Sequence, residues 1–175
     1  MAWYDPYVAI TSDEKWKSLM REVYNFAYEN GEDPSTLNAA MLVDDNLKKL
    51  VIASNGFPKG AKEVVGWNKR PTKYAISNHA ERAVICKAAR EGVKTERLTM
   101  ICPWAACFNC SNAIIYSGIK TLVLHKQMFD KTPEDWIPEI ISCLRLLKRN
   151  NIELIMYNGK IGQCKGFMRQ EVWSP

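Results

Sequence analysis

A histidine with a glutamate two residues after it, and two cysteines three residues apart, constrain this 175-residue chain more than any other pattern in it. His79 and Glu81 form the first half, and Cys107 and Cys110 form the second. One imidazole and two thiolates bind zinc and leave its fourth position for a water, whose protons the spare carboxylate can move. The fold must therefore bring two distant segments of the chain to one metal ion.

Each half of the motif is expected to open a helix. Residues 79–91 are rich in strong helix formers, and residues 108–117 form the next predicted helix. A predicted strand at 98–102 lies between them. Free backbone N–H groups and the positive end of the dipole at a helix start favour the thiolate forms of Cys107 and Cys110.

The remaining pattern predicts one domain over residues 1–175, with a core at about 12–157. The predicted segments are a helix at about 12–29 with a capping box at Thr11 and Glu14, strands at 38–44, 49–54, 121–125 and 152–157, and a helix at 133–149. We expect an α/β fold, a three-layer α/β/α sandwich around a mixed five-stranded sheet. Residues 1–11 are expected to be an extension, and the tail 158–175 is expected to dock on the body.

The six cysteines do not suggest a disulfide framework, because the chain is too long and too poor in cysteine for such a scaffold. Cys86, Cys102 and Cys143 have apolar neighbours and are expected to be buried, so Cys102 is not taken as a rival metal ligand. No apolar run approaches the roughly 18–20 residues that span a bilayer, and the first residues do not resemble a secretory signal. We therefore expect no membrane partner and an intracellular, cytoplasmic location.

The net charge of +5 is concentrated in a long loop at about 55–74. Its basic side chains, against the single acid Glu63, are Lys59, Lys62, Lys69, Arg70 and Lys73. This cluster is either a solvated loop or a site for anions, such as nucleotide phosphates or a nucleic-acid backbone, and charge alone does not separate these. The sequence has no long basic stripe with interleaved aromatics, which makes nucleic acid the weaker partner.

Four stretches between about residues 29 and 156 carry a family resemblance: EDPSTLNAAMLV, SNGFPKG, RPTKYAISNHAERAVICKAAREG and CSNAIIYSGIKTLVL. They resemble the cytidine and deoxycytidylate deaminase family, which has a cytidine-deaminase-like α/β fold. NGFPKG together with RPTKY is most similar to the deoxycytidylate (dCMP) deaminases. One departure is visible, since Ala106 stands where the family has a proline before the first cysteine. That departure puts the shape of the pocket wall in question.

The resemblance implies hydrolytic deamination of a free cytosine nucleotide, with dCMP converted to dUMP and ammonia. It implies a Zn²⁺ cofactor held by His79, Cys107 and Cys110. Glu81 would take a proton from the attacking water and return protons to N3 and to the leaving amine of the ring.

The resemblance also suggests substrate contacts. Asn55 would hydrogen-bond the sugar, unless it is an ordinary turn residue, and the backbone N–H of Ala80 would hold the pyrimidine carbonyl. Trp104 and Phe57 either flank the base by stacking or belong to the core. Lys59 and its basic neighbours would bind the 5′-phosphate or, as in the dCMP branch, an allosteric nucleoside triphosphate at a subunit interface of a homo-oligomer.

Three alternatives remain open from the sequence. The enzyme could act on a polynucleotide, such as tRNA adenosine or single-stranded cytosine, for which Trp104 before the cysteine pair is the favourable feature. It could deaminate a modified or purine nucleotide, given the altered segment 103–106. The chain could also be an idle nucleotide-binding module with structural zinc, although Glu81, which has no ligand role, argues against that. His125 ends a predicted strand, where it is either solvated or at the rim of the site.

Overall fold

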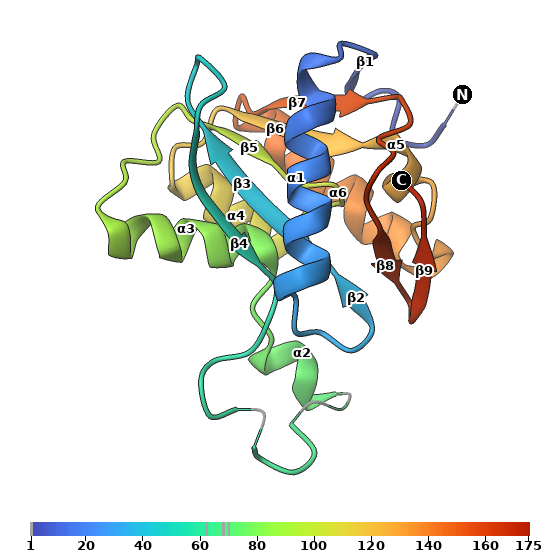
Figure 1. The fold of residues 1–175 in the computed structure, drawn as a ribbon. Coiled ribbons are helices and arrows are strands. Elements are labelled where there is room, and N and C mark those ends of the chain that lie inside the picture. Colours follow the sequence, from blue (N-terminus) through green and yellow to red (C-terminus); the bar gives the residue numbers. More distant parts are fainter. Residues whose placement is uncertain (1, 62, 68, 70) are drawn as a thin grey trace.

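The centre of the protein is a six-stranded sheet with helices on both faces (Figure 1). The computed structural model describes residues 2–175 except 62, 68 and 70. In spatial order, the strands of this sheet are β1 (Ala9–Thr11), β7 (Glu153–Tyr157), β6 (Thr121–His125), β5 (Thr99–Ile101), β3 (Ala39–Val43) and β4 (Lys49–Ser54). The helices are α1 (Lys15–Asn30), α2 (Thr72–Ile76), α3 (Ala80–Glu91), α4 (Phe108–Tyr116), α5 (Lys126–Phe129) and α6 (Ile137–Arg149), with a 3₁₀ turn η1 (Glu134–Trp136) before α6. None of the described helices is both long and apolar enough to cross a membrane.

The sheet is mixed, as expected. β1, β7, β6 and β5 run parallel, while β3 pairs antiparallel with both β5 and β4. The predicted hairpin of 38–44 and 49–54 is confirmed as β3 and β4, in which Met41 lies opposite Ile52. All residues of β3 and β6 are buried, because these strands run between two covering layers.

The sheet has six strands rather than the expected five, because residues 9–11 add the edge strand β1. β1 pairs parallel with β7, with Ala9 opposite Ile155. The predicted capping box is wrong for the same reason: Thr11 lies in the strand, and the N-cap residue of α1, Glu14, makes no side-chain capping bond. An edge strand of three residues is too short to show an alternation of apolar and polar side chains.

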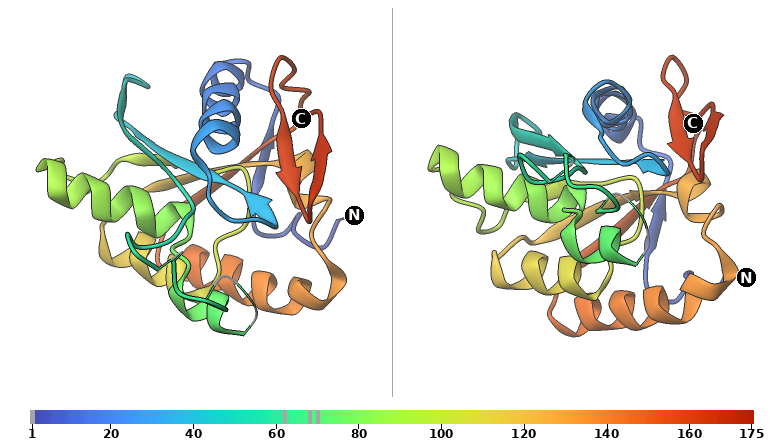
Figure 2. Two further views of the ribbon diagram at one scale, coloured as in Figure 1. Left: turned by 60° about the horizontal axis from the view of Figure 1, so that its bottom comes forward. Right: turned by 90° about the horizontal axis from the view of Figure 1, so that it is seen from below.

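Helices lie on both faces of the sheet (Figure 2), and an apolar cluster fills the space under each layer, which confirms the three-layer prediction. α1 covers one face, where Met20 packs in a cluster with Met41 of β3. α3, α4 and α6 cover the other face, where Val84 and Ile114 pack in a cluster with Leu42. β3 therefore sends alternate side chains into the two layers, as the two-residue period of a strand dictates.

The C-terminal segment docks beside α1, as predicted for the tail 158–175. β8 (Gly166–Met168) and β9 (Glu171–Trp173) form a hairpin, and β8 also pairs with β2 (Thr36–Leu37) in a second sheet. Arg21 of α1 donates two hydrogen bonds to backbone carbonyls of this tail. The tail thereby supports the segment that leads into β3.

The predicted basic loop leaves the sheet after β4 and ends in α2, directly before the histidine motif (Figure 1). Two of its basic residues, Lys62 and Arg70, lie outside the described residues.

Cys102 and Cys143 are buried as expected, but the prediction for Cys86 is wrong because that residue is exposed. It lies on the side of α3 away from the residues that pack against the sheet.

Candidate active site

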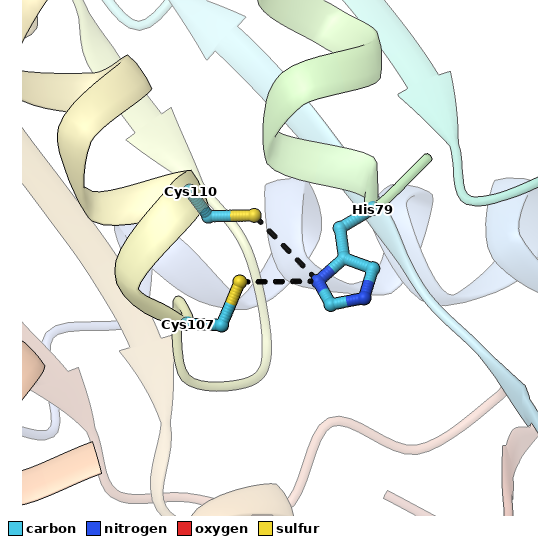
Figure 3. A group of neighbouring side chains, drawn as sticks. All are labelled: His79, Cys107 and Cys110. Atoms are coloured by element: carbon cyan, nitrogen blue, oxygen red, sulfur yellow. Dashed lines mark hydrogen bonds between the residues drawn. The ribbon is translucent and has the colours of Figure 1, made fainter. Parts of the chain in front are cut away.

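The two halves of the motif meet between the starts of α3 and α4. His79 is the N-cap residue of α3, Cys107 is the N-cap residue of α4, and Cys110 lies in the first turn of α4. The His79 Nδ1 atom lies 3.5 Å from the Cys107 sulfur and 3.6 Å from the Cys110 sulfur (Figure 3). The three ligand atoms all lie within 4.8 Å of one another. The structure therefore brings the three predicted ligands together.

These spacings fit a tetrahedral zinc site. Zinc binds sulfur at about 2.3 Å and imidazole nitrogen at about 2.0–2.1 Å, so a tetrahedral angle places a bound nitrogen and a bound sulfur about 3.6 Å apart. Both nitrogen–sulfur distances in the cluster match that value. A set of two cysteines and one histidine leaves one position of a four-coordinate zinc open, which is the arrangement of a catalytic rather than a structural site.

Hydrogen bonding within the cluster separates the two cysteines. Hydrogen bonds from the Cys110 thiol and the His79 ring lower the pKa of Cys107 to about 3. The hydrogen bond to the Cys107 sulfur, together with burial, raises the pKa of Cys110. The bond with Cys107 also raises the pKa of His79. These opposite shifts favour the thiolate form of Cys107 over that of Cys110, and Cys110 would have to give up its proton to hold zinc.

Glu81 is enclosed beside this cluster, in the first turn of α3. Its side chain is 2% exposed and lines the same pocket as His79 and Cys107. Burial raises the pKa of Glu81, although the charge of His79 opposes the shift. A carboxyl group with a raised pKa accepts and returns protons more readily near neutral pH, which is the property of a general acid and base.

A cavity of about 430 Å³ opens next to the cluster. Of the side chains expected at the site, Asn55 and Trp104 line it together with Glu81, and Ala80 contributes to the same wall. Lys59 is exposed and is not among the residues that line the cavity, so the structure does not bring it to the site. Phe57 is not part of the lining either.

Both side-chain groups of Asn55 bond the backbone of the segment before β3. The Asn55 Oδ1 atom accepts a hydrogen bond from the Asn38 N–H at 2.9 Å, and its Nδ2 donates to the Thr36 carbonyl at 2.7 Å. Asn55 therefore shapes this wall of the pocket by holding β2 and the start of β3. Its contact with a sugar stays a prediction.

Trp104 lies in the pocket wall, where contacts with two neighbouring side chains fix its position. Its ring stacks on Trp136, with the ring centroids 5.3 Å apart and the planes at 15°. Its Nε1 donates a hydrogen bond to the Thr132 hydroxyl at 3.0 Å. Trp104 lines the pocket and also packs against apolar neighbours, while its stacking on a base stays a prediction.

Sequence reasoning did not single out a buried ion pair in the lining. Lys73 Nζ lies 2.7 Å from Asp33 Oδ1, and the two side chains are 9% and 12% exposed. Lys73 appeared only as one of several basic residues in the loop, and nothing local showed that it would turn inward. Asn38 also lines the pocket, and a polar residue among apolar neighbours at the start of a predicted strand is the signal that could have identified it.

Three residues near the motif lie outside the lining. Ala106, which replaces the family proline, is 3% exposed and sits behind the wall, while the neighbouring Ala105 lines the pocket. Cys102 is fully buried, as expected for a core residue, and the metal-ligand cluster found among the described residues does not include it. His125 is neither solvated nor at the pocket, because it is fully buried and bonded to Tyr24.

Comparisons with known proteins agree with this geometry. Residues 13–126 match the family model described as the cytidine and deoxycytidylate deaminase zinc-binding region. The deoxycytidylate deaminases of Homo sapiens and Mus musculus are each 27% identical over 126 residues, which is 69% of this chain and 70% of theirs.

The fold is similar to that of solved deaminases. The dCMP deaminase of the cyanophage S-TIM5, in complex with dCMP and dUMP, superposes with a TM-score of 0.63 at 18% identity, over 83% of this chain and 98% of that one. A bifunctional deaminase and reductase of Thermotoga maritima gives a TM-score of 0.57 at 21% identity, over 81% of this chain and 36% of that one. The family match covers more than half of the chain and includes its zinc-binding motif. The chain therefore belongs to the cytidine and deoxycytidylate deaminase family and is a zinc-dependent hydrolytic deaminase.

Proposed function

We propose that this deaminase acts on a free cytosine nucleotide and that its preferred substrate is dCMP. The observation that carries the proposal is that two residues of the three-ligand cluster, His79 and Cys107, line one cavity of about 430 Å³ together with the buried Glu81, a size typical of small-molecule sites. The dCMP assignment is supported by the curated relatives, which are named deoxycytidylate deaminases.

In this proposal the chain supplies the ligands and the proton carrier. Zinc held by His79, Cys107 and Cys110 would supply Lewis-acid chemistry that acidifies a water. Glu81 would take a proton from that water and pass protons to N3 and to the leaving amine of the cytosine ring. The N–H of Ala80 has no partner within α3, because it belongs to the first turn, and it would donate to the pyrimidine carbonyl.

Two basic side chains in the lining suit the phosphate of a nucleotide. Lys73 is already paired with Asp33, whereas Arg82 forms no ion pair within the described part of the chain. The Nη2 atom of Arg82 donates to the Ser77 carbonyl, which leaves other N–H groups of the guanidinium for an anion. We propose that Arg82, rather than Lys59, provides most of the charge that attracts a phosphate group to the pocket.

The experiment that tests this function is a substrate panel followed by ammonia release. The panel contains dCMP, dCTP, CMP, cytidine, adenine and guanine nucleotides, single-stranded DNA and tRNA. We expect the highest kcat/KM with dCMP. A purine nucleotide or a polynucleotide as the best substrate would overturn the proposal.

One observation favours a second candidate, a polynucleotide substrate. Trp67 and Tyr74 are 41% and 47% exposed on the loop that flanks the pocket, together with the basic residues Lys59 and Lys69. Exposed aromatics beside positive charges suit stacking of bases along a single strand. The salt dependence of binding separates the two candidates: affinity that falls steeply between low and physiological salt indicates many phosphates, and a shallow fall indicates one.

We also propose that the protein is a homo-oligomer. Phe108 and Tyr116 on α4 are 44% and 90% exposed, which suits a surface that a second copy covers. Light scattering coupled to size exclusion tests this, and a monomer at micromolar concentration would contradict it. Control by a nucleoside triphosphate is a separate proposal. The ammonia-release assay, repeated with dCTP or dTTP added, tests it.

A further inference from the structure

Asn38 is a buried polar residue of the pocket wall, directly before β3. It is 8% exposed and lines the cavity together with Ala80 and Glu81. By the two-residue period of a strand, its side chain lies on the same side of the sheet as Ala40 and Leu42. Those two residues pack in the cluster that α3 covers. Asn38 therefore faces the helix start that carries the metal ligand and the proton carrier.

The backbone of Asn38 is held on both sides by Asn55. The Asn38 N–H donates to the Asn55 Oδ1 at 2.9 Å, and the Asn38 carbonyl accepts from the Asn55 N–H at 2.9 Å. These bonds continue the β3–β4 pairing by one residue. The position of the Asn38 side chain is thus set by the sheet and not by a mobile loop.

The carboxamide of Asn38, in contrast, is only half satisfied. Its Nδ2 donates to the Cys102 sulfur at 3.3 Å, which is a weak acceptor, and its Oδ1 has no partner among the described residues. Turning the amide over would leave the NH₂ group unused instead, so one half lacks a partner in either orientation. An enclosed polar group without a partner is destabilising, and its presence in a substrate pocket is explained when a ligand supplies the missing bond.

We propose that Asn38 is a specificity residue that hydrogen-bonds the base of the substrate. Asn38 lines the same cavity as Glu81, which must reach the reacting edge of the ring, so a base held there for Glu81 would also lie within reach of Asn38. A carboxamide can pair with the donor and acceptor groups on the edge of a base, as asparagine and glutamine do when they read adenine. The inference rests on the deaminase function of this pocket and not on the choice of dCMP.

The test compares two valine variants of the adjacent pair. Asn38→Val removes both polar atoms and shortens the side chain by one heavy atom, and Cys102→Val removes the protein partner of the amide but leaves Asn38 in place. Each protein is assayed with the deoxynucleoside monophosphates of cytosine, 5-methylcytosine, 5-hydroxymethylcytosine, adenine and guanine. Binding of the reaction product, zinc content and thermal unfolding are measured in parallel, and Asn38→Ser provides a second variant if the valine protein does not fold.

For Asn38→Val we expect a fall of about tenfold in kcat/KM for the base that the wild type prefers, the size of one lost hydrogen bond. We also expect the ratio of kcat/KM between the two best bases to change by a similar factor. Cys102→Val should leave that ratio within about twofold. These results, with zinc content unchanged, would support base recognition by Asn38.

Two results would overturn the inference. One is an Asn38 variant that folds, keeps its zinc and shows the wild-type ratio between bases. The other is an equal change of that ratio in Cys102→Val, which would show that the pair acts only through packing. Wild-type protein that deaminates no member of this panel would contradict the proposed free-nucleotide substrate, and this inference with it, whereas the two results above leave that substrate in place, so the failures are distinguishable.

Discussion

The buried ion pair between Lys73 and Asp33 predicts how far the free energy of unfolding falls when one partner is removed. The Lys73 Nζ and Asp33 Oδ1 atoms are 2.7 Å apart, with the side chains 9% and 12% exposed, and the pair ties α2 to the segment before β2. Removing one partner of a buried pair leaves the other charge buried without a partner, which destabilises the folded state by about 3–5 kcal/mol. Because Asp33 Oδ1 also accepts the N–H groups of Ser35 and Thr36, we take the lower end for Lys73→Met. The expected fall in the free energy of unfolding is about 3 kcal/mol.

A matched control isolates the effect of burial. Lys94 and Glu96 also lie 2.7 Å apart, but their side chains are 81% and 59% exposed. Lys94→Met should therefore leave stability unchanged within experimental scatter, because water screens an exposed pair. Urea unfolding followed by far-ultraviolet circular dichroism gives both values from the midpoint at constant slope. Equal midpoints for Lys73→Met and Lys94→Met would refute the argument.

Three further outcomes follow from the core and the metal site. Burial lowers the pKa of His125, so the folded state resists a proton that the unfolded chain takes up below pH ~6.5. Stability should therefore fall by up to about 1.4 kcal/mol per pH unit as pH drops below that value. His125→Gln should flatten this dependence in urea titrations from pH 8 to 5, and identical pH profiles would contradict it. Tyr24→Phe removes the hydroxyl bonded to His125 Nδ1 at 2.7 Å and should cost about 1–3 kcal/mol by the same measurement. Treatment with a chelator should lower the Tm and abolish ammonia release, and added zinc should restore both; an unchanged Tm would argue against a metal bound by the folded state.

The metal ligands and the three layers could be predicted because their signals are local. The spacing of Cys107 and Cys110 allows both sulfurs to reach one ion from a single helical turn. The helix formers after His79 mark the start of α3, and the apolar runs mark the buried strands. Each of these signals needs only neighbours in the sequence, and each is present in the structure.

The rest of the pocket depends on contacts between distant segments, and these leave no local signal. Nothing near Lys73 or Lys59 distinguishes the lysine that turns inward onto Asp33 from the one that stays exposed. The unsatisfied amide of Asn38 becomes visible only when β5 brings Cys102 beside it. β1 was missed because its three residues gain their strand conformation from pairing with β7 and not from their own pattern.

The central claim is that Glu81 carries the protons of a reaction at a zinc held by the neighbouring side chains. Glu81→Gln should keep stoichiometric zinc and the wild-type Tm, because the residue is not a ligand, while ammonia release falls by at least about a hundredfold. Glu91→Gln, an exposed position at the end of the same helix, is the control and should retain full turnover. Full turnover in Glu81→Gln, or purified wild-type protein without zinc that still releases ammonia, would contradict the account.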